Sequence, residues 1–268
     1  MLRPNRVRVA YREGRPSFGV YARIPSTATI ELLAHAGLDF VRIDLLENHI
    51  GPETLRALIQ AAHAAGITPF VRVPAVDPDA IRTALDLGAS GVIVPEVESA
   101  ADVATAVRAA KLPPHGRRRI GLTGVDGHGR IAPEEYATWA AEHVLLGVQV
   151  ETRAALDDLD AILAVPGLDM VLGGRGTLAA QLGVPGQRDH PRVVETEARL
   201  MDRARDAGKI ISITYMPVRD PAQTTPVCDW IARGIHSVAL GLDADFVYVY
   251  RRLLATLAPA APTRRREV

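Results

Sequence analysis

The sequence predicts an α/β fold, a (β/α)8 TIM barrel in a single domain, and three observations support this prediction. A chain of 268 residues with 48% hydrophobic residues is long enough for one large α/β core. Short β-branched runs alternate eight times with Ala- and Leu-rich segments of helical periodicity. Glycines stand where these helices should end and prolines where they should begin, as at Gly66 and Pro78. Eight strand–helix repeats favour a closed barrel.

The individual elements follow from the same alternation. Strands are expected at Phe18–Ala22, Phe40–Asp44, Thr68–Val73, Gly91–Val97, Leu145–Glu151, Met170–Gly174, Ile210–Tyr215 and Ser237–Leu242. Helices are expected at about 27–37, 52–65, 78–88, 99–111, 153–164, 191–207, 221–233 and 244–257. The barrel should therefore cover residues 1–257, and the Pro- and Arg-rich tail 258–268 should be disordered. A doubly wound open sheet is the alternative, although no Gly-rich phosphate turn follows the first strand.

Composition excludes several classes of function. The 31 basic and 31 acidic residues give no net charge, which argues against a nucleic-acid or anionic-membrane binder. No apolar run is long enough for a transmembrane helix, and the N-terminus lacks the apolar core of a signal peptide. The single cysteine, Cys228, is expected in the core and cannot form an intrachain disulfide. A cytoplasmic location follows as the expectation.

Lysine is nearly absent, and this limits the carbonyl chemistry that the protein can perform. The two lysines, Lys111 and Lys209, fall at a helix end and a strand start, on the face of a barrel that carries stability rather than catalysis. Neither is placed to form a Schiff base with a substrate. Lysine-based aldol chemistry is therefore not expected.

Charged residues close several of the predicted strands. Glu151 ends the fifth strand, Asp44 ends the second, and Arg72 lies late in the third. Because active sites of parallel barrels open at the C-terminal strand ends, Glu151 is either a metal ligand or an acid/base, unless it only caps the next helix. Arg72 can bind a carboxylate or an enolate oxygen through two charge-assisted hydrogen bonds. Its structural alternative is a buried ion pair with Asp44 or Glu47.

The motifs at these strand ends, taken in order, resemble the HpcH/HpaI aldolase family of the pyruvate/phosphoenolpyruvate barrel superfamily, which includes the citrate lyase β-subunit. The likeness covers residues 5–257 and is carried by Gly19–Val20, Asp39–Asp44, Phe70–Pro74, Gly91–Pro95, Val148–Glu151 and Gly241–Asp243. It implies a lyase of the class II aldolase type, which acts on a small 2-oxo acid through a pyruvate-like enolate. It also implies a homo-oligomer built from dimers, up to a hexamer, in which the last helix packs on a neighbour.

The resemblance also assigns roles to individual residues. Glu151 matches the metal-binding glutamate, Arg72 the arginine that stabilises the enolate, and Asp44 the aspartate after the second strand. Gly174, Arg175 and Gly176 occupy the segment whose backbone contacts the pyruvate carboxylate. The metal implied is Mg2+ or Mn2+.

Two chemical positions depart from the family pattern. Thr177 replaces the aspartate that is the second metal ligand, and a hydroxyl is a poorer ligand for a hard cation. Glu47 stands where the family has its histidine base, whereas His49 takes that role if the loop is two residues longer. In one account the chain keeps enolate chemistry with a rearranged metal site. In the other it is a metal-independent decarboxylase, cyclase or isomerase of a biosynthetic pathway, or a non-catalytic binding protein on the same scaffold.

Overall fold

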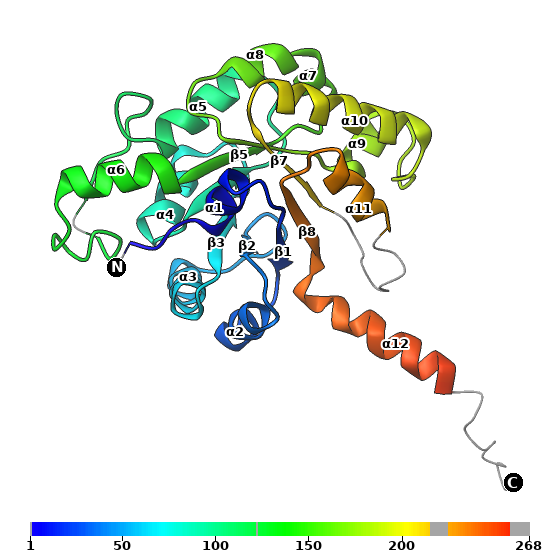
Figure 1. Ribbon diagram of the computed structural model, residues 1–268, viewed down its shortest axis with the longest axis horizontal. Coiled ribbons are helices and arrows are strands. Elements are labelled where there is room, and N and C mark those ends of the chain that lie inside the picture. The colour runs from blue at the N-terminus through cyan, green and yellow to red at the C-terminus, as the bar shows by residue number, and fades with distance from the viewer. Residues whose placement is uncertain (1, 122, 215–224, 258–268) are drawn as a thin grey trace, which may run out of the picture.

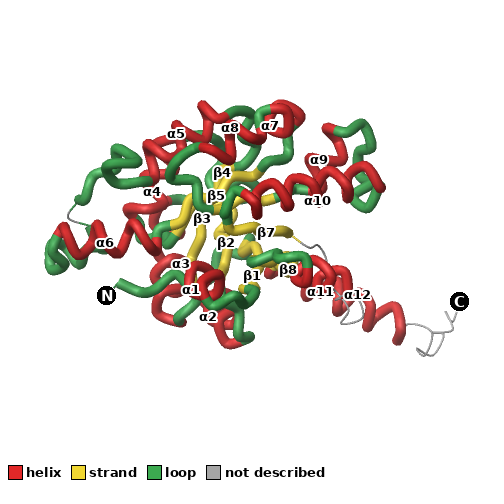
Figure 2. Tube along the Cα trace, turned by 45° about the horizontal axis from the view of Figure 1, so that its top comes forward, coloured by secondary structure: helices red, strands yellow, loops and turns green. Residues whose placement is uncertain are grey.

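The computed structural model describes residues 2–121, 123–214 and 225–257, and its strands form a closed parallel barrel (Figures 1 and 2). The order is β1-β2-β3-β4-β5-β6-β7-β8, and β8 pairs with β1 to close the sheet. The strands are β1 Ser17–Ala22, β2 Phe40–Asp44, β3 Thr68–Arg72, β4 Gly91–Val94, β5 Leu145–Gln149, β6 Met170–Leu172, β7 Ile210–Thr214 and β8 Ser237–Leu242. The predicted (β/α)8 barrel is confirmed.

Most of the helices lie around the outer face of the strands, whereas α12 extends away from the barrel (Figures 1 and 2). They are α1 Arg6–Arg12, α2 Thr27–His35, α3 Pro52–Ala65, α4 Pro78–Asp86, α5 Ala100–Ala110, α6 Pro133–His143, α7 Arg153–Asp157, α8 Leu159–Ala164, α9 Arg175–Gln181, α10 Pro191–Asp206, α11 Thr225–Ala232 and α12 Phe246–Leu257. The helix expected at 153–164 is split at Asp158, whose carboxylate instead accepts a hydrogen bond from the N–H of Ala100 at 2.7 Å. Within the described residues no helix combines the length and apolar content that crossing a membrane requires.

The N-terminal helix α1 was not predicted, and it closes one end of the barrel. Asn5 caps α1 through its side-chain oxygen, and its amide nitrogen donates to the carbonyls of Ser90 and His143, each at 3.0 Å. Those carbonyls lie just before β4 and β5, so α1 sits at the N-terminal strand ends. Val7 packs into the barrel interior. The C-terminal ends of the strands are left to form the site.

Aromatic rings fill the barrel interior, and glycines on the strands make room for them. Phe40 and Phe70 meet edge to face, with ring centroids 6.0 Å apart. A Cβ added to Gly19 would lie 2.4 Å from the Phe40 ring, and one added to Gly91 would lie 2.5 Å from the Phe70 ring. These two glycines therefore allow large side chains to occupy the barrel interior.

Several strands end earlier than predicted, and the predicted core position of Cys228 is wrong. β4 ends at Val94, two residues before Glu96, which has a positive φ of 48°, and Glu151 lies two residues beyond the end of β5. Cys228 is exposed on α11, where the neighbouring Val227 and Trp230 occupy the buried face. The tail 258–268, expected to be disordered, and Tyr215 of the expected seventh strand lie outside the described residues.

Candidate active site

Asp44 and Arg72 form a buried ion pair at the C-terminal ends of β2 and β3. Arg72 Nε donates to Asp44 Oδ1 at 2.8 Å, and Nη2 donates to Oδ2 at 2.6 Å. Arg23 adds a third contact, from Nε to Asp44 Oδ2 at 3.0 Å. Burial opposes the charge of Arg72, but the hydrogen bonds and the charge of Asp44 outweigh it and raise the pKa of Arg72. The guanidinium is therefore a fixed, permanent cation.

This pair is the structural alternative considered for Arg72, yet it leaves part of the guanidinium available. Nη1 makes only a long contact, 3.5 Å, with Gln149 Oε1. Gln149 in turn places its Nε2 3.4 Å from Glu151 Oε2. Arg72, Gln149 and Glu151 thus form a row across the barrel mouth, and the structure brings Arg72 and Glu151 to the same place.

Glu151 is buried, with 4% of its surface exposed, and burial raises its pKa to about 7. The positive charge of Arg72 and a backbone hydrogen bond from Glu96 offset part of this effect, whereas the negative charge of Glu96 adds to it. Glu96 has the positive φ noted above, a conformation that is uncommon for residues other than glycine. A carboxyl group with a pKa near neutrality is suited to carry a proton.

The backbone of Gly174 lies directly against Glu151. A Cβ added to Gly174 would fall 1.6 Å from Glu151 Oε2, so any side chain there would displace the carboxylate. Gly174 is also the N-cap of α9, and Gly176 lies in the first turn of that helix. Gly174 of the predicted glycine segment therefore reaches the site through its backbone.

Three predicted site residues make no direct contact with the row of Arg72, Gln149 and Glu151. Arg175 binds Glu197 at 2.6 Å and Asp189 at 3.1 Å, and its guanidinium lies over the ring of Trp230. Glu47 and His49 are both exposed on the loop after β2. Of these two, Glu47 acts electrostatically on Arg72.

Sequence reasoning missed Gln149, Tyr21 and Arg42. Gln149 could have been found because it lies two residues before Glu151 and so faces the same side of the strand. Tyr21 lies under Arg72, whose guanidinium carbon is 4.7 Å from the centre of the ring. Arg42 shares the inner face of β2 with Asp44, at a spacing of two residues.

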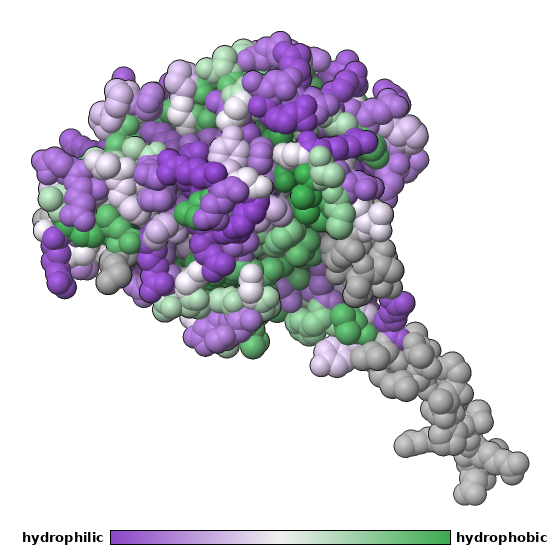
Figure 3. Space-filling view, viewed as in Figure 1, coloured by the Kyte–Doolittle hydropathy of each residue, from purple (hydrophilic) through white to green (hydrophobic). Residues whose placement is uncertain are grey.

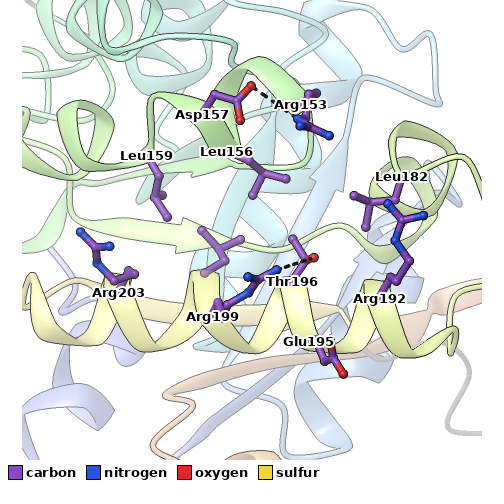
Figure 4. A pocket seen from close by; sticks show the side chains of 11 residues that line it. Arg153, Leu156, Asp157, Leu159, Leu182, Arg192, Glu195, Thr196, Arg199 and Arg203 are labelled. Atoms are coloured by element: carbon purple, nitrogen blue, oxygen red, sulfur yellow. Dashed lines mark hydrogen bonds and ion pairs between the residues drawn. The ribbon is translucent and has the colours of Figure 1, made fainter.

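A large open groove lies away from the strand ends. The strand-end residues are therefore chosen as the candidate site for their chemistry and not because they line a large cavity. A hollow of about 540 Å³ separates α7 and α8 from α10 (Figure 4). Leucines such as Leu156 and Leu159 line it, with arginines such as Arg199 and Arg203 around them. None of the predicted site residues borders this groove.

The residues present supply few ligands for a divalent metal. Glu151 is the carboxylate in the row, and Thr177 on α9 offers a hydroxyl where the family resemblance places a second carboxylate. In the described part of the chain no group of three or more His, Cys, Asp and Glu side chains is arranged to hold a metal ion. This donor set does not by itself form a cage for a hard cation, which takes six or more oxygen ligands.

Comparison with known proteins agrees with this geometry. The chain is 36% identical to a 4-hydroxy-2-oxovalerate aldolase of Rhodococcus jostii (strain RHA1), over 91% of this chain and 92% of the relative. It is 34% identical to a 4-hydroxy-2-oxo-heptane-1,7-dioate aldolase of Shigella sonnei (strain Ss046), over 97% of this chain and 94% of the relative.

Structure comparison and a family model complete the assignment. The fold matches the crystal structure of an HpcH/HpaI aldolase from Desulfitobacterium hafniense DCB-2 with a TM-score of 0.85 and 26% identity, covering 95% of this chain and 97% of that one. Residues 17–248 match the family model described as HpcH/HpaI aldolase/citrate lyase. The chain therefore belongs to the HpcH/HpaI aldolase/citrate lyase family, as its strand-end motifs predict.

Proposed function

We propose that the protein is a carbon–carbon lyase that cleaves a 4-hydroxy-2-oxo acid to pyruvate and an aldehyde, or joins them in the reverse direction. The observation that carries this proposal is the row of Arg72, Gln149 and Glu151, with Arg72 fixed by Asp44. The aldolase names of the relatives support the same reaction. They favour enolate chemistry over the alternative of a metal-independent decarboxylase, cyclase or isomerase.

The reaction needs a cation beside the C2 oxygen of the substrate and a group that moves a proton. The C4 hydroxyl loses its proton, the C3–C4 bond breaks, and the electron pair of that bond forms the C2–C3 double bond of an enolate. The negative charge then resides on the C2 oxygen, until C3 takes up a proton to give pyruvate. Arg72 Nη1, which is not used by Asp44, is the donor for the C2 oxygen. Asp44 positions Arg72.

Glu151 is the proposed proton carrier, because its pKa of about 7 lets it hold and release a proton near neutral pH. Glu47 is the second candidate, since its charge acts on Arg72, and His49 follows as the third. The backbone of Gly174, Arg175 and Gly176 is the proposed contact for the substrate carboxylate. The side chain of Arg175 is held by Glu197 and would support that segment from behind.

A pyruvate-release assay on a series of 4-hydroxy-2-oxo acids tests the proposed function. We expect pyruvate and an aldehyde in equal amounts, with the aldehyde determined by the substrate offered. Exchange of the C3 protons of pyruvate with deuterated water should occur without an aldehyde, because enolate formation alone is sufficient for it. Absence of both pyruvate release and proton exchange would contradict the proposal.

The effect of metal on activity should depend on Thr177. A Mg2+ or Mn2+ ion would have Glu151 and substrate oxygens as ligands, and Glu47 or His49 would then carry the proton in place of Glu151. We therefore expect weak Mn2+ binding by calorimetry and reduced activity in EDTA. Replacing Thr177 with Asp restores a second carboxylate and should tighten Mn2+ binding about tenfold or more. Thr177→Asn, which matches aspartate in shape without its charge, is the control. Equal Mn2+ affinity in all three proteins would mean that Thr177 is not next to the metal.

The C-terminal helix supports assembly into an oligomer. α12 stands away from the barrel, and hydrophobic side chains lie where it leaves the barrel (Figures 1 and 3). Phe246, Val249 and Tyr250 on this helix are more than half exposed, at 52%, 51% and 63%. An exposed apolar surface of this kind is typical of a protein interface. We propose that α12 packs on a second copy of the chain.

A further inference from the structure

Arg42 is a fully buried cation inside the barrel, one layer below Asp44 and Arg72. Only 1% of its surface is exposed. Nη1 donates to the hydroxyls of Tyr21 and Thr214, each at 3.4 Å, and Nη2 donates to Ser212 Oγ. Its Nε has no partner in the structure. All three acceptors are neutral, so no carboxylate within the described residues balances this charge.

The other buried cations of the described chain are arranged differently. Arg72 pairs with Asp44, Lys111 with Asp169, and Arg118 with Asp86. A buried charge without a counter-ion costs stability, and a hydrophobic residue of the same volume would avoid that cost. Burial lowers the pKa of Arg42, and the like charge of Arg72 lowers it further. Burying Arg42 is therefore unfavourable for folding. We look for the reason for its presence in the chemistry of the site.

Tyr21 connects Arg42 to the candidate active site. The guanidinium carbon of Arg42 is 5.2 Å from the centre of the Tyr21 ring, and that of Arg72 is 4.7 Å from the same point. The charge of Arg72 is balanced by Asp44, whereas that of Arg42 is not. Asp44 is shared by Arg72 and Arg23, and Arg42 adds a further positive charge, without a carboxylate partner, at the floor of the barrel mouth. The surroundings there have a low dielectric, in which such a charge acts strongly.

We propose that Arg42 is a positioning residue whose unbalanced charge favours the enolate over the substrate, with Tyr21 held between it and Arg72. This inference rests on the proposed lyase function. The 2-oxo acid carries one negative charge on its carboxylate, and the enolate carries a second on the C2 oxygen. The added positive charge of Arg42 stabilises the dianion more than the monoanion, and only such a difference accelerates the reaction.

The test compares two anions of similar shape that differ in charge. Pyruvate represents the monoanionic state and oxalate the dianionic enolate, and the binding of both is measured by calorimetry in buffer that contains EDTA, so that no metal ion contributes to either affinity. Arg42→Met keeps an unbranched side chain and removes its charge. We expect it to weaken oxalate binding about tenfold and pyruvate binding less than about twofold. Turnover should fall about tenfold with KM little changed, while Tm stays equal or rises. Arg42→Lys should restore most of the oxalate affinity.

Controls and contrary outcomes separate this inference from the proposed function. Lys111→Met removes a buried cation at the opposite end of the barrel that has a carboxylate partner, so it should lower Tm and leave the ratio of the two affinities unchanged. Should Arg42→Met fail to fold, Arg42→Gln removes the charge and supplies a neutral amide as a hydrogen-bond donor. An unchanged affinity ratio in the folded variant would overturn the role of Arg42 alone. Failure of the wild-type protein to bind either anion would overturn the proposed function together with this inference.

Discussion

Replacement of Arg72 by Met is expected to reduce kcat/KM about a thousandfold, because it removes the donor for the enolate oxygen. The same change leaves Asp44, which has no exposed surface, with Arg23 as its remaining cationic partner. Loss of one partner of a buried ion pair costs about 3 kcal/mol of stability. Steady-state kinetics and chemical denaturation of the same preparation would measure both effects.

Arg72→Lys separates the catalytic role of Arg72 from its structural one. Lysine keeps the positive charge beside Asp44 but cannot donate to Asp44 and to the substrate at fixed angles. We expect its stability to lie close to that of the wild type while kcat/KM remains reduced about a hundredfold. Arg118→Lys, at a buried arginine that binds Asp86, is the matched control and should retain activity. Wild-type kcat/KM in Arg72→Lys would show that Arg72 serves only the structure.

The barrel could be predicted because the signals that define it are local. Each strand is a short β-branched run, and each helix begins and ends at residues such as Pro78 and Gly66 that restrict the backbone in known ways. The short helix α1 gave no such signal, since it buries only Val7 and Ala10 and depends on contacts of Asn5 with residues more than 80 positions away. A tertiary contact of this range has no trace in the local pattern.

The candidate site was only partly predictable, for a related reason. Position at a strand end identified Glu151, Arg72 and Asp44, and the family and lyase class to which they pointed are confirmed. Their side-chain partners depend on which strands are neighbours and at what register, so the link through Gln149 was not foreseen. The orientation of Arg175 toward Glu197 on α10 likewise depends on helix packing, which the sequence pattern does not specify.

Replacement of Glu151 should also cause a large loss of kcat. Glu151→Gln keeps the shape of the side chain and removes its proton transfer, so we expect a loss of a hundredfold or more in kcat. If Glu151 only capped the following helix, the amide of glutamine would replace the carboxylate with little loss of activity. Measuring proton exchange of pyruvate in the same variant would show whether the lost step is the one at C3.

The stability of the protein should fall with rising pH because of Glu151. Its pKa is raised from 4.5 in the unfolded chain to about 7 in the folded one, so the folded state binds the proton more tightly. This contribution is therefore fully present below about pH 4.5 and is lost as the pH rises through about 7. Between about pH 5 and pH 8 the free energy of unfolding should decrease by roughly 2 kcal/mol in EDTA, and Glu151→Gln should abolish that decrease. Glu31→Gln, on an exposed position of α2, should retain it. Parallel plots of the free energy of unfolding against pH for the wild type and Glu151→Gln would mean that the carboxyl group titrates alike in the folded and unfolded states. Glu151 would then not carry a proton near neutral pH, and the proposed mechanism depends on that proton.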